Sequence, residues 1–400
     1  MSFNLGVYAD IKKVITNPDY AKSKHLIVKE FGKIFIIKYD KIYLNINNIN
    51  TLGLFRSVIV DENANILSFS PIKSYNLLNN DFIKNKKFDQ YSILEFIEGS
   101  MINLFWHPYL QDWELSTKSN IGAKNSFNNN NTFRYMFLQA CNKVGLDFDL
   151  LNKKFSYSFV LQHPDNRIVV PFNEMKLYLI NIYSFNNDII NLCNNAFNSV
   201  LYDLNNTNID TPNIFNKKDM DINNFYDLIN YVDTKNLNYK TVGYICYDYN
   251  TGERIKIRNK NYEIVRRLKG NTPKLQFQYF HLRQLNKVKE FLNYYPEYKT
   301  EFSNFRNDLH IWTQKLYNYY IHCFIKKDKP LKEYPYEFKP HLYELHKLYI
   351  DTLMPEKKYV SKSIVINYIN NLPPQRLMYS INHQIKLNKI DEKKAFRTLD

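Results

Sequence analysis

Cysteine and histidine are the first residue types to consider, because thiolates and imidazoles bind metals and act as nucleophiles. The four cysteines, Cys141, Cys193, Cys246 and Cys323, lie tens of residues apart, so the chain has no Cys-x-x-Cys pair. Its nine histidines form no cluster with the spacing of metal ligands. We therefore expect no metal site and mostly reduced, structural thiols, which leaves lysine and arginine to carry the chemistry.

The balance of charge points to a polyanionic partner. The chain has 54 Lys and Arg against 39 Asp and Glu, a formal net charge of +15 and an isoelectric point near 9.2. Each phosphate that a lysine or arginine neutralises releases condensed counterions, so this basicity favours nucleic acid as a ligand. The basic residues are spread along the whole chain, and no single tail carries them.

Four groups of segments combine basic residues with Gly, Pro or Asn. They are Leu54–Val60 with Ser70–Asn76, Leu94–Met101 with Thr117–Ser119, Phe159–Val169 with Glu174–Leu179, and Thr241–Ile245 with Ile255–Tyr262. In this order they resemble the motifs of the bacteriophage RNA ligase branch of the covalent nucleotidyltransferases, over roughly residues 25–265. In such enzymes a lysine amine attacks the α-phosphate of a nucleotide, acidic groups hold ribose and metal, and further lysines neutralise phosphate charge.

The resemblance implies phosphate-binding or RNA-binding roles for five basic residues. Arg56 lies where the family has an Arg-Gly strand, and Lys73 lies in a Pro-x-x-Lys segment whose spacing is one residue shorter here. Lys118 matches a Ser-Lys-Gly segment, and Lys256 and Arg258 match the Lys-x-Lys strand. An arginine at the second of those positions keeps the charge and binds phosphate at least as well as lysine.

The same alignment of motifs shows three losses of catalytic side chains. Phe96 stands at the position of the nucleophilic lysine, Val160 at that of a ribose-binding glutamate, and Val242 at that of a glutamate near the metal. A phenyl ring cannot form a phosphoramidate. The other residues that the resemblance places in the pocket are Glu98, at the position of the family's aspartate, Gly99 and Tyr178. We infer that anion binding is kept while adenylyl transfer is lost, with a bound nucleotide as the one candidate cofactor.

An active enzyme is the competing interpretation. Lys38-Tyr39-Asp40-Lys41 is a literal Lys-x-Asp sequence, so Lys38 is a candidate for a displaced nucleophile. Lys41, however, stands where the family has a glycine that allows close approach of the phosphate. The tetrapeptide also precedes the Arg56 strand, which is the wrong order for this branch of the family.

Short runs of β-branched and aromatic residues predict the strands that would position these side chains. The predicted strands are Leu26–Val28, Ile34–Ile37, Val58–Val60, Ile66–Phe69, a strand group over 91–106, Asp112–Thr117, Tyr157–Leu161, Arg167–Val170, Met175–Tyr183, Gly243–Tyr247 and Arg254–Ile257. Asn250-Thr251-Gly252 predicts a hairpin turn between the last two strands. Residues 133–145 predict a helix that ends at Gly145, and 125–131 an Asn-rich loop.

Beyond Pro273 the spacing of apolar residues becomes helical, as in Leu275, Tyr279 and Leu282. We therefore expect two domains, an RNA ligase-like domain over 1–272 and a helical domain over 273–400. The aromatic residues of 294–299 and 315–320 fit a helical core better than base stacking. The fold class is α+β, and the resemblance implies the nucleotidyltransferase (ATP-grasp-like ligase) fold of antiparallel sheets with helices, plus an all-α C-terminal domain.

The main hypothesis is a non-catalytic protein that binds RNA or a nucleotide, such as an RNA 5′ end, with a protein partner for the helical domain. An active ATP-dependent ligase and a structural adaptor are the alternatives. No uninterrupted apolar stretch approaches 18 residues, so we expect no membrane partner and a cytoplasmic protein. Heavy use of Asn and Ile indicates an AT-rich genome, and with the resemblance this suggests a large DNA virus, viral RNA handling or translation, and the host cytoplasm.

Overall fold

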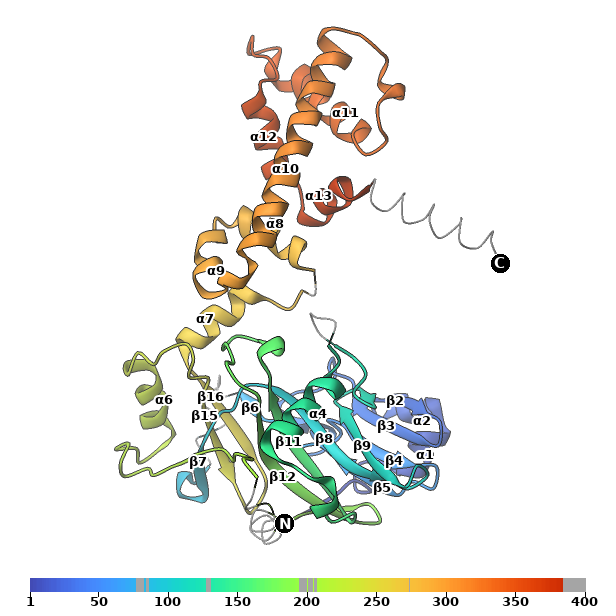
Figure 1. Ribbon diagram of the computed structural model, residues 1–400, viewed down its shortest axis with the longest axis vertical. Helices are drawn as coiled ribbons and strands as arrows, with labels where there is room; N and C mark the ends of the chain where they lie inside the picture. The colour runs from blue at the N-terminus through green and yellow to red at the C-terminus, as the bar shows by residue number, and fades with distance from the viewer. Residues whose placement is uncertain are drawn as a thin grey trace. The chain divides into compact units, whose positions relative to one another are not determined.

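The computed structural model describes residues 1–76, 83, 86–126, 131–193, 200, 204, 207–272 and 274–383. The chain divides into two compact units, Met1–Arg266 and Arg267–Asp400 (Figure 1). This division falls inside helix α7 (Lys260–Lys269). Pro273, on which the predicted domain boundary rests, and 127–130 of the predicted Asn-rich loop lie outside the described residues. The boundary at 272 therefore stays a prediction.

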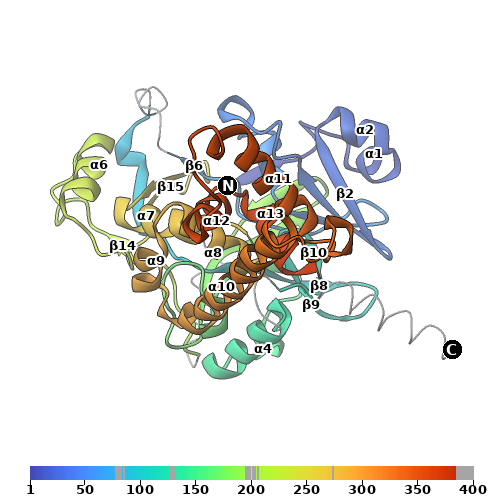
Figure 2. The same cartoon turned by 90° about the horizontal axis from the view of Figure 1, so that it is seen from above.

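The first unit begins with a small antiparallel sheet that follows two short helices. Helices α1 (Ile11–Thr16) and α2 (Pro18–Ser23) lie beside the edge strand β2 (Figures 1 and 2). The sheet runs in the order β2 (Leu26–Phe31), β3 (Ile34–Tyr39), β4 (Val58–Asp61), β5 (Ile66–Phe69). The short 3-10 helices η1 (Ile46–Asn48) and η2 (Leu52–Leu54) connect β3 to β4. All four predicted strands are confirmed.

A seven-stranded antiparallel sheet forms the middle of this unit. Its order is β1 (Ser2–Asn4), β13 (Ile189–Leu192), β12 (Lys176–Asn186), β11 (Phe155–Gln162), β8 (Ser100–His107), β9 (Asp112–Thr117), β10 (Asn120–Ile121). Helix α4 (Phe133–Val144) packs on it through buried Phe137 and Cys141, as predicted, and ends at Gly145 with φ 76°. The 3-10 helix η4 (Phe148–Leu150) then leads into β11.

The third sheet carries some of the segments on which the family resemblance rests, among them Thr241–Ile245 and Ile255–Tyr262. Its order is β14 (Ile214–Phe215), β7 (Tyr91–Glu95), β15 (Gly243–Asp248), β16 (Arg254–Arg258), β6 (Tyr75–Asn76), and only the β16–β6 pairing is parallel. The 3-10 helix η3 (Phe88–Gln90) precedes β7. One face packs on helix α6 (Phe225–Thr234) through Ile255 and Ile257, so Arg254, Lys256 and Arg258 alternate onto the other face. The predicted α+β class with antiparallel sheets is confirmed.

Two predictions of secondary structure in this unit are wrong. Arg167–Val170 is not a strand, because the 3-10 helix η5 (Pro164–Asn166) precedes it and the amides of Val169 and Val170 donate to the Glu98 carboxylate instead of to a neighbouring strand. No helix or strand was predicted within 188–235, but this stretch contains β13 and α6. Helices α1 and α2 were not predicted either.

Every regular element in the described part of the second unit is helical. They are α8 (Leu275–Gln284), α9 (Val288–Tyr294), η6 (Pro296–Tyr298), α10 (Lys299–Tyr320), the π-helix η7 (Ile321–Ile325), η8 (Leu331–Glu333), α11 (Lys339–Leu348), the π-helix η9 (Tyr349–Leu353), α12 (Lys362–Asn370) and α13 (Pro374–Ile381). Phe291 and Phe302 stack with ring centroids 5.1 Å apart, and Tyr295 and Tyr320 are buried. The aromatic residues that we considered for base stacking thus include members of the helical core.

Candidate functional site

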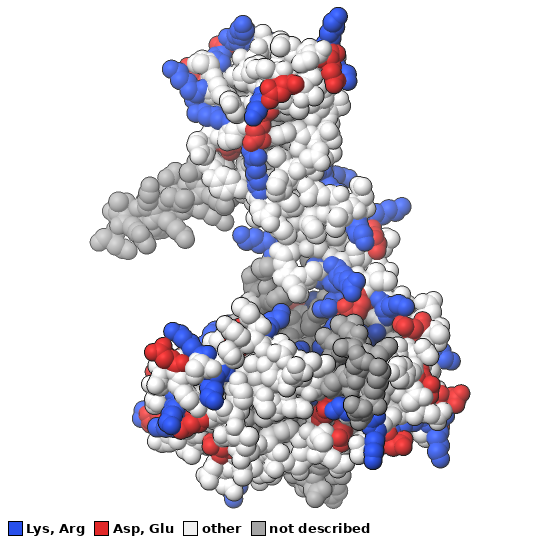
Figure 3. All heavy atoms as spheres, turned by 180° about the vertical axis from the view of Figure 1, so that it is seen from behind, with Lys and Arg blue, Asp and Glu red and all other residues white. Residues whose placement is uncertain are grey.

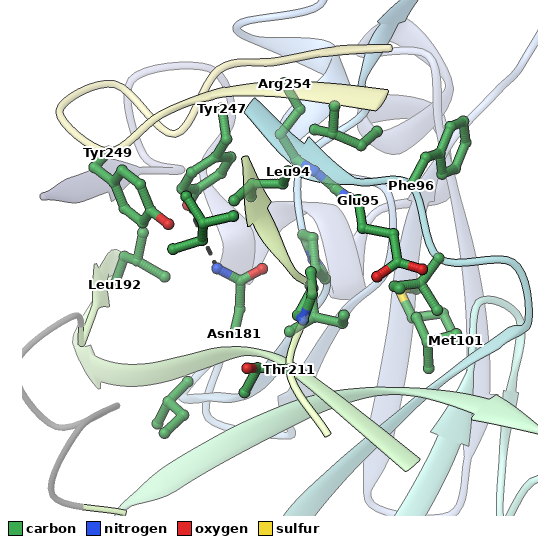
Figure 4. Close-up of a pocket in the computed structure, with 18 of the residues that line it drawn as sticks. Leu94, Glu95, Phe96, Met101, Asn181, Leu192, Thr211, Tyr247, Tyr249 and Arg254 are labelled. Atoms are coloured by element: carbon green, nitrogen blue, oxygen red, sulfur yellow. Dashed lines mark hydrogen bonds between the residues drawn. The ribbon is translucent and has the colours of Figure 1, made fainter. Parts of the chain in front are cut away.

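A cavity of about 590 Å³ lies between the third sheet and the seven-stranded sheet. Figure 4 shows side chains from β7, β12, β15 and β16 directed into it. Its walls are mostly aliphatic and aromatic, and the polar side chains among them are few. The lining residues include Arg56, Leu94, Glu95, Phe96, Gly99, Val160, Ile180, Asn181, Ile182, Leu192, Ile245, Tyr247, Tyr249 and Arg254. A concave, largely apolar site of this size is typical of small-ligand pockets.

The structure brings the five predicted basic residues together beside this cavity. Arg56 follows η2, Lys73 lies between β5 and β6, Lys118 lies in the turn between β9 and β10, and Lys256 and Arg258 are on β16. Arg56, Lys73 and Arg258 each lower the pKa of Lys256, and Arg56 and Lys73 lower that of Lys118. We call these five residues the cation cluster.

Burial and mutual repulsion shift the titration of the cation cluster. Burial is the main cause that lowers the pKa of Lys256 to about 7, and of Lys118 to about 8. Burial also lowers the pKa of Arg56 to about 10, and Arg254 contributes to that shift. Burial, Arg56 and Arg258 lower the pKa of Lys73. A bound anion would relieve this repulsion, so the arrangement is suited to phosphate groups.

Three further basic residues were given no phosphate-binding role from the sequence. Lys41 and Arg254 were given no binding role, and Lys38 was a candidate nucleophile only. Lys38 donates to Ser119 Oγ over 3.1 Å, and both Lys38 and Lys41 lower the pKa of Lys118. Arg254 lies on the same face of β16 as Lys256. The period of two along Arg254-x-Lys256-x-Arg258 is the sequence signal that identifies it. Figure 3 shows lysines and arginines dispersed over one face of the molecule, interspersed with acids.

Phe96, Val160 and Val242, the three residues that the resemblance aligns with catalytic positions, all lie in well-defined surroundings. The amide of Phe96 donates to the carbonyl of Gly243 over 3.2 Å, and the Arg258 guanidinium lies 5.5 Å from the Phe96 ring centroid. Val160 lines the cavity. Val242 is 5% exposed. None of the three side chains can bind a proton, a metal or a phosphate.

Glu98 is committed to structural hydrogen bonds. Its Oε1 accepts from the Tyr262 hydroxyl at 2.6 Å, and its Oε2 accepts from the amides of Val170 at 2.7 Å and Val169 at 3.3 Å. It is 7% exposed, and burial raises its pKa. The sequence placed Glu98 in the pocket, but this residue does not line the cavity, because its carboxylate is directed to α7 and the loop after η5.

Of the other two residues expected in the pocket, Gly99 lines the cavity and Tyr178 does not. Gly99 lines the cavity, and a Cβ built on it would lie 2.5 Å from the carbonyl oxygen of Leu161, so only glycine allows this approach of the chain to β11. Tyr178 does not line the cavity. Its main chain forms an isolated β-bridge with Asp210. Burial is the main cause that raises the pKa of its hydroxyl, and the charge of Asp210 is the second.

Replacing Glu98 by alanine is expected to lower the free energy of unfolding by about 3 kcal/mol, because a buried hydroxyl and two amides lose their acceptor. Chemical denaturation of the two proteins measures the difference. Glu95→Ala is the matched control, because that carboxylate accepts from the exposed Asn213 and should change stability by about 0.5 kcal/mol or less. Equal midpoints for Glu98→Ala and the wild type would contradict a structural role.

In the described part of the chain, no group of three or more His, Cys, Asp or Glu side chains is placed so that it could hold a metal ion. Within the same residues, no helix is long and apolar enough to cross a membrane. Both findings concern those residues alone.

Comparison with known proteins gives a sequence relative and distant structures. No family model matches the sequence. A 102-residue segment is 29% identical to an RNA ligase of Rhodothermus phage RM378, and this match takes in 23% of each chain. An archaeal ATP-dependent RNA ligase (9% identity, TM-score 0.40) covers 93% of this chain and 78% of its own. A protein of Aquifex aeolicus, provisionally described as an ATP-dependent DNA ligase (11% identity, TM-score 0.40), covers 84% and 80%. Over the matched 102 residues the chain is therefore similar to a phage RNA ligase.

Proposed function

We propose that this chain is a catalytically inactive, RNA ligase-like protein that binds RNA or a nucleotide at the cation cluster, with an RNA 5′ end as the preferred ligand. The observation that carries this proposal is the pairing of a retained cation cluster with Phe96 at the position of the family's nucleophile. Electrostatic attraction for phosphate persists, whereas the group that would form the covalent bond is missing. In this role the protein would act in viral RNA handling or translation and not in joining RNA.

Lys38 supports one alternative, an active ligase with a displaced nucleophile. Its burial lowers its pKa, which is the usual way to make a lysine amine nucleophilic at neutral pH. Its ammonium group, however, donates to Ser119 Oγ. Its strand, β3, lies in the small sheet, whereas β7 lies in the third sheet. We therefore favour a phosphate-binding role for Lys38 as well.

Incubation with ATP or GTP labelled at the α-phosphate and with Mg²⁺ or Mn²⁺ is expected to give no acid-labile protein adduct. The test is gel autoradiography of the wild type, of Phe96→Lys and of Lys38→Ala. Phe96→Lys should stay unlabelled too, because Val160 and Val242 leave ribose and metal without acidic ligands. A labelled wild-type band that disappears in Lys38→Ala would overturn the proposal in favour of the active enzyme.

A structural adaptor without affinity for RNA is the remaining alternative, and RNA affinity distinguishes it from our proposal. Affinity that falls steeply as salt rises supports a phosphate-binding cleft. No RNA or nucleotide binding at low salt would favour the adaptor.

A further inference from the structure

The guanidinium group of Arg254 lies in the cavity without a partner among the residues that the structure describes. Its side chain extends from β16 into the cavity (Figure 4), and burial lowers its pKa. Among the described residues its guanidinium forms no hydrogen bond and no ion pair. Arg56, which faces the same cavity, donates to the carbonyl oxygen of Pro71 and to no other residue that the structure describes. Both arginines are only partly exposed, and guanidinium groups that lose most of their hydration are normally paired, because losing it without a replacement is costly. The two donors are therefore available to a ligand with hydrogen-bond acceptors.

Glu95 supplies the complementary group in the same cavity. Its Oε2 accepts from the exposed Asn213 at 2.7 Å, which leaves most of the acceptor capacity of the carboxylate for a ligand. The other walls of the cavity are largely apolar, with Leu94, Ile180 and Ile245 among them. Such walls suit the flat faces of a heteroaromatic ring, and the two charged groups suit the polar edges of that ring.

We propose that this cavity binds a guanine base and discriminates against adenine. Guanine presents O6 and N7, two adjacent acceptors, to a guanidinium such as that of Arg254, and its N1–H and N2 amino group to a carboxylate such as that of Glu95. Adenine has an amino donor beside N7, and its N1 is an acceptor. In the same orientation, adenine would place its amino donor against the donors of Arg254 and its N1 acceptor against the carboxylate of Glu95.

This inference rests on the proposed function, because it assigns the base of the nucleotide whose phosphates the cation cluster would bind. Strand β16 connects the two places. Arg254 faces the cavity, and Lys256, the next residue on the same face, has its pKa lowered by burial, by Lys73 and by Arg258. Two residues along a strand span roughly 6.6 Å. A base beside Arg254 thus leaves its phosphate within reach of Lys256 and Lys73.

The test compares GMP, IMP and AMP binding to the full chain by calorimetry. GMP should bind about 100-fold more tightly than AMP, since two bidentate contacts distinguish them. IMP, which lacks the N2 amino group, should fall between them. Arg254→Met should reduce the preference for GMP over AMP to about threefold or less, and Glu95→Gln should remove most of the preference for GMP over IMP. Arg306→Met, which changes an exposed arginine of α10, is the matched control and should leave both ratios unchanged.

The outcomes separate this inference from the proposed function. Equal affinity for GMP and AMP in the wild type overturns the guanine assignment and leaves nucleotide binding in place. Absence of binding to all three nucleotides, together with RNA affinity that depends on Lys73 and Lys256, also overturns the assignment alone. Absence of binding to nucleotides and to RNA overturns both. The comparison of ligands in the wild type needs no variant, so a misfolded variant does not obscure it.

Discussion

Simultaneous replacement of Lys73, Lys256 and Arg258 by glutamate is expected to weaken RNA binding about 1,000-fold at moderate salt. Each of these side chains would otherwise make a charge-assisted contact with phosphate worth about 1.5 kcal/mol or more. The slope of log affinity against log salt should fall by about two units, at roughly 0.7 per phosphate contact for a single strand. Fluorescence anisotropy with a 5′-phosphorylated RNA oligonucleotide over a salt series measures both quantities.

The control for net charge is the triple variant Lys326→Glu, Lys327→Glu and Lys329→Glu. These lysines are exposed and follow η7 in the helical unit. They change the formal charge by the same amount and should reduce affinity about tenfold or less. Equal losses from the two triple variants, both folded by circular dichroism, would show that only bulk charge attracts RNA. The cation cluster would then have no specific role.

The second large effect concerns pH. Burial and neighbouring cations lower the pKa of Lys256 to about 7 and that of Lys118 to about 8, so each is protonated below that value. Affinity for inorganic triphosphate should therefore fall roughly 30-fold between pH 6.5 and pH 9, because two charges are lost in this range. Bound phosphate raises both pKa values, so binding near pH 8 should take up protons from the buffer. Calorimetry in buffers of different ionisation enthalpy measures this uptake.

The stability of the free protein should vary with pH in the opposite direction. The folded pKa of Lys256 lies below its unfolded value of about 10.4, so the unfolded chain binds more protons between pH 7 and pH 10. The contribution of Lys256 to the free energy of unfolding therefore increases as pH rises from 7 to 10, so the folded protein becomes more stable. Lys256→Arg keeps the charge at every pH and should flatten the dependence of triphosphate affinity on pH, whereas Lys326→Arg should not. An affinity that is constant from pH 6.5 to pH 9 in the wild type would contradict the lowered pKa values.

The sequence was most informative where one periodicity dominates a segment. The alternation in Arg254–Arg258 and the helical spacing from Phe133 to Gly145 are local signals, and both elements form as predicted. Arg167–Val170 has the β-branched composition of a strand, but its amides bond to Glu98, about 70 residues away in the chain. No local pattern encodes such a partner.

The candidate site was less accessible to sequence reasoning. The resemblance named Arg56, Lys73, Lys118, Lys256 and Arg258, and the structure places them together, but their spacing in the chain does not require it. Strand pairings between segments more than 100 residues apart, such as β7 with β15, bring the cluster together. The same pairings place Arg254 and Glu95 around one cavity, which explains why neither residue was selected from the sequence alone.

The hydrogen bond from the Phe96 amide to the Gly243 carbonyl has a consequence for how such a protein can change over time. Main-chain atoms hold the end of β7 against β15, and glycine at 243 allows β15 to lie close to β16, because a Cβ there would lie 2.1 Å from the carbonyl oxygen of Ile257. The side chain at position 96 takes no part in either contact. Exchange between a reactive and an inert side chain at this position therefore leaves the backbone frame intact. If the proposed function holds, an ancestral enzyme could have lost its nucleophile by such a substitution without losing a stable fold, and selection could have kept the binding surface throughout.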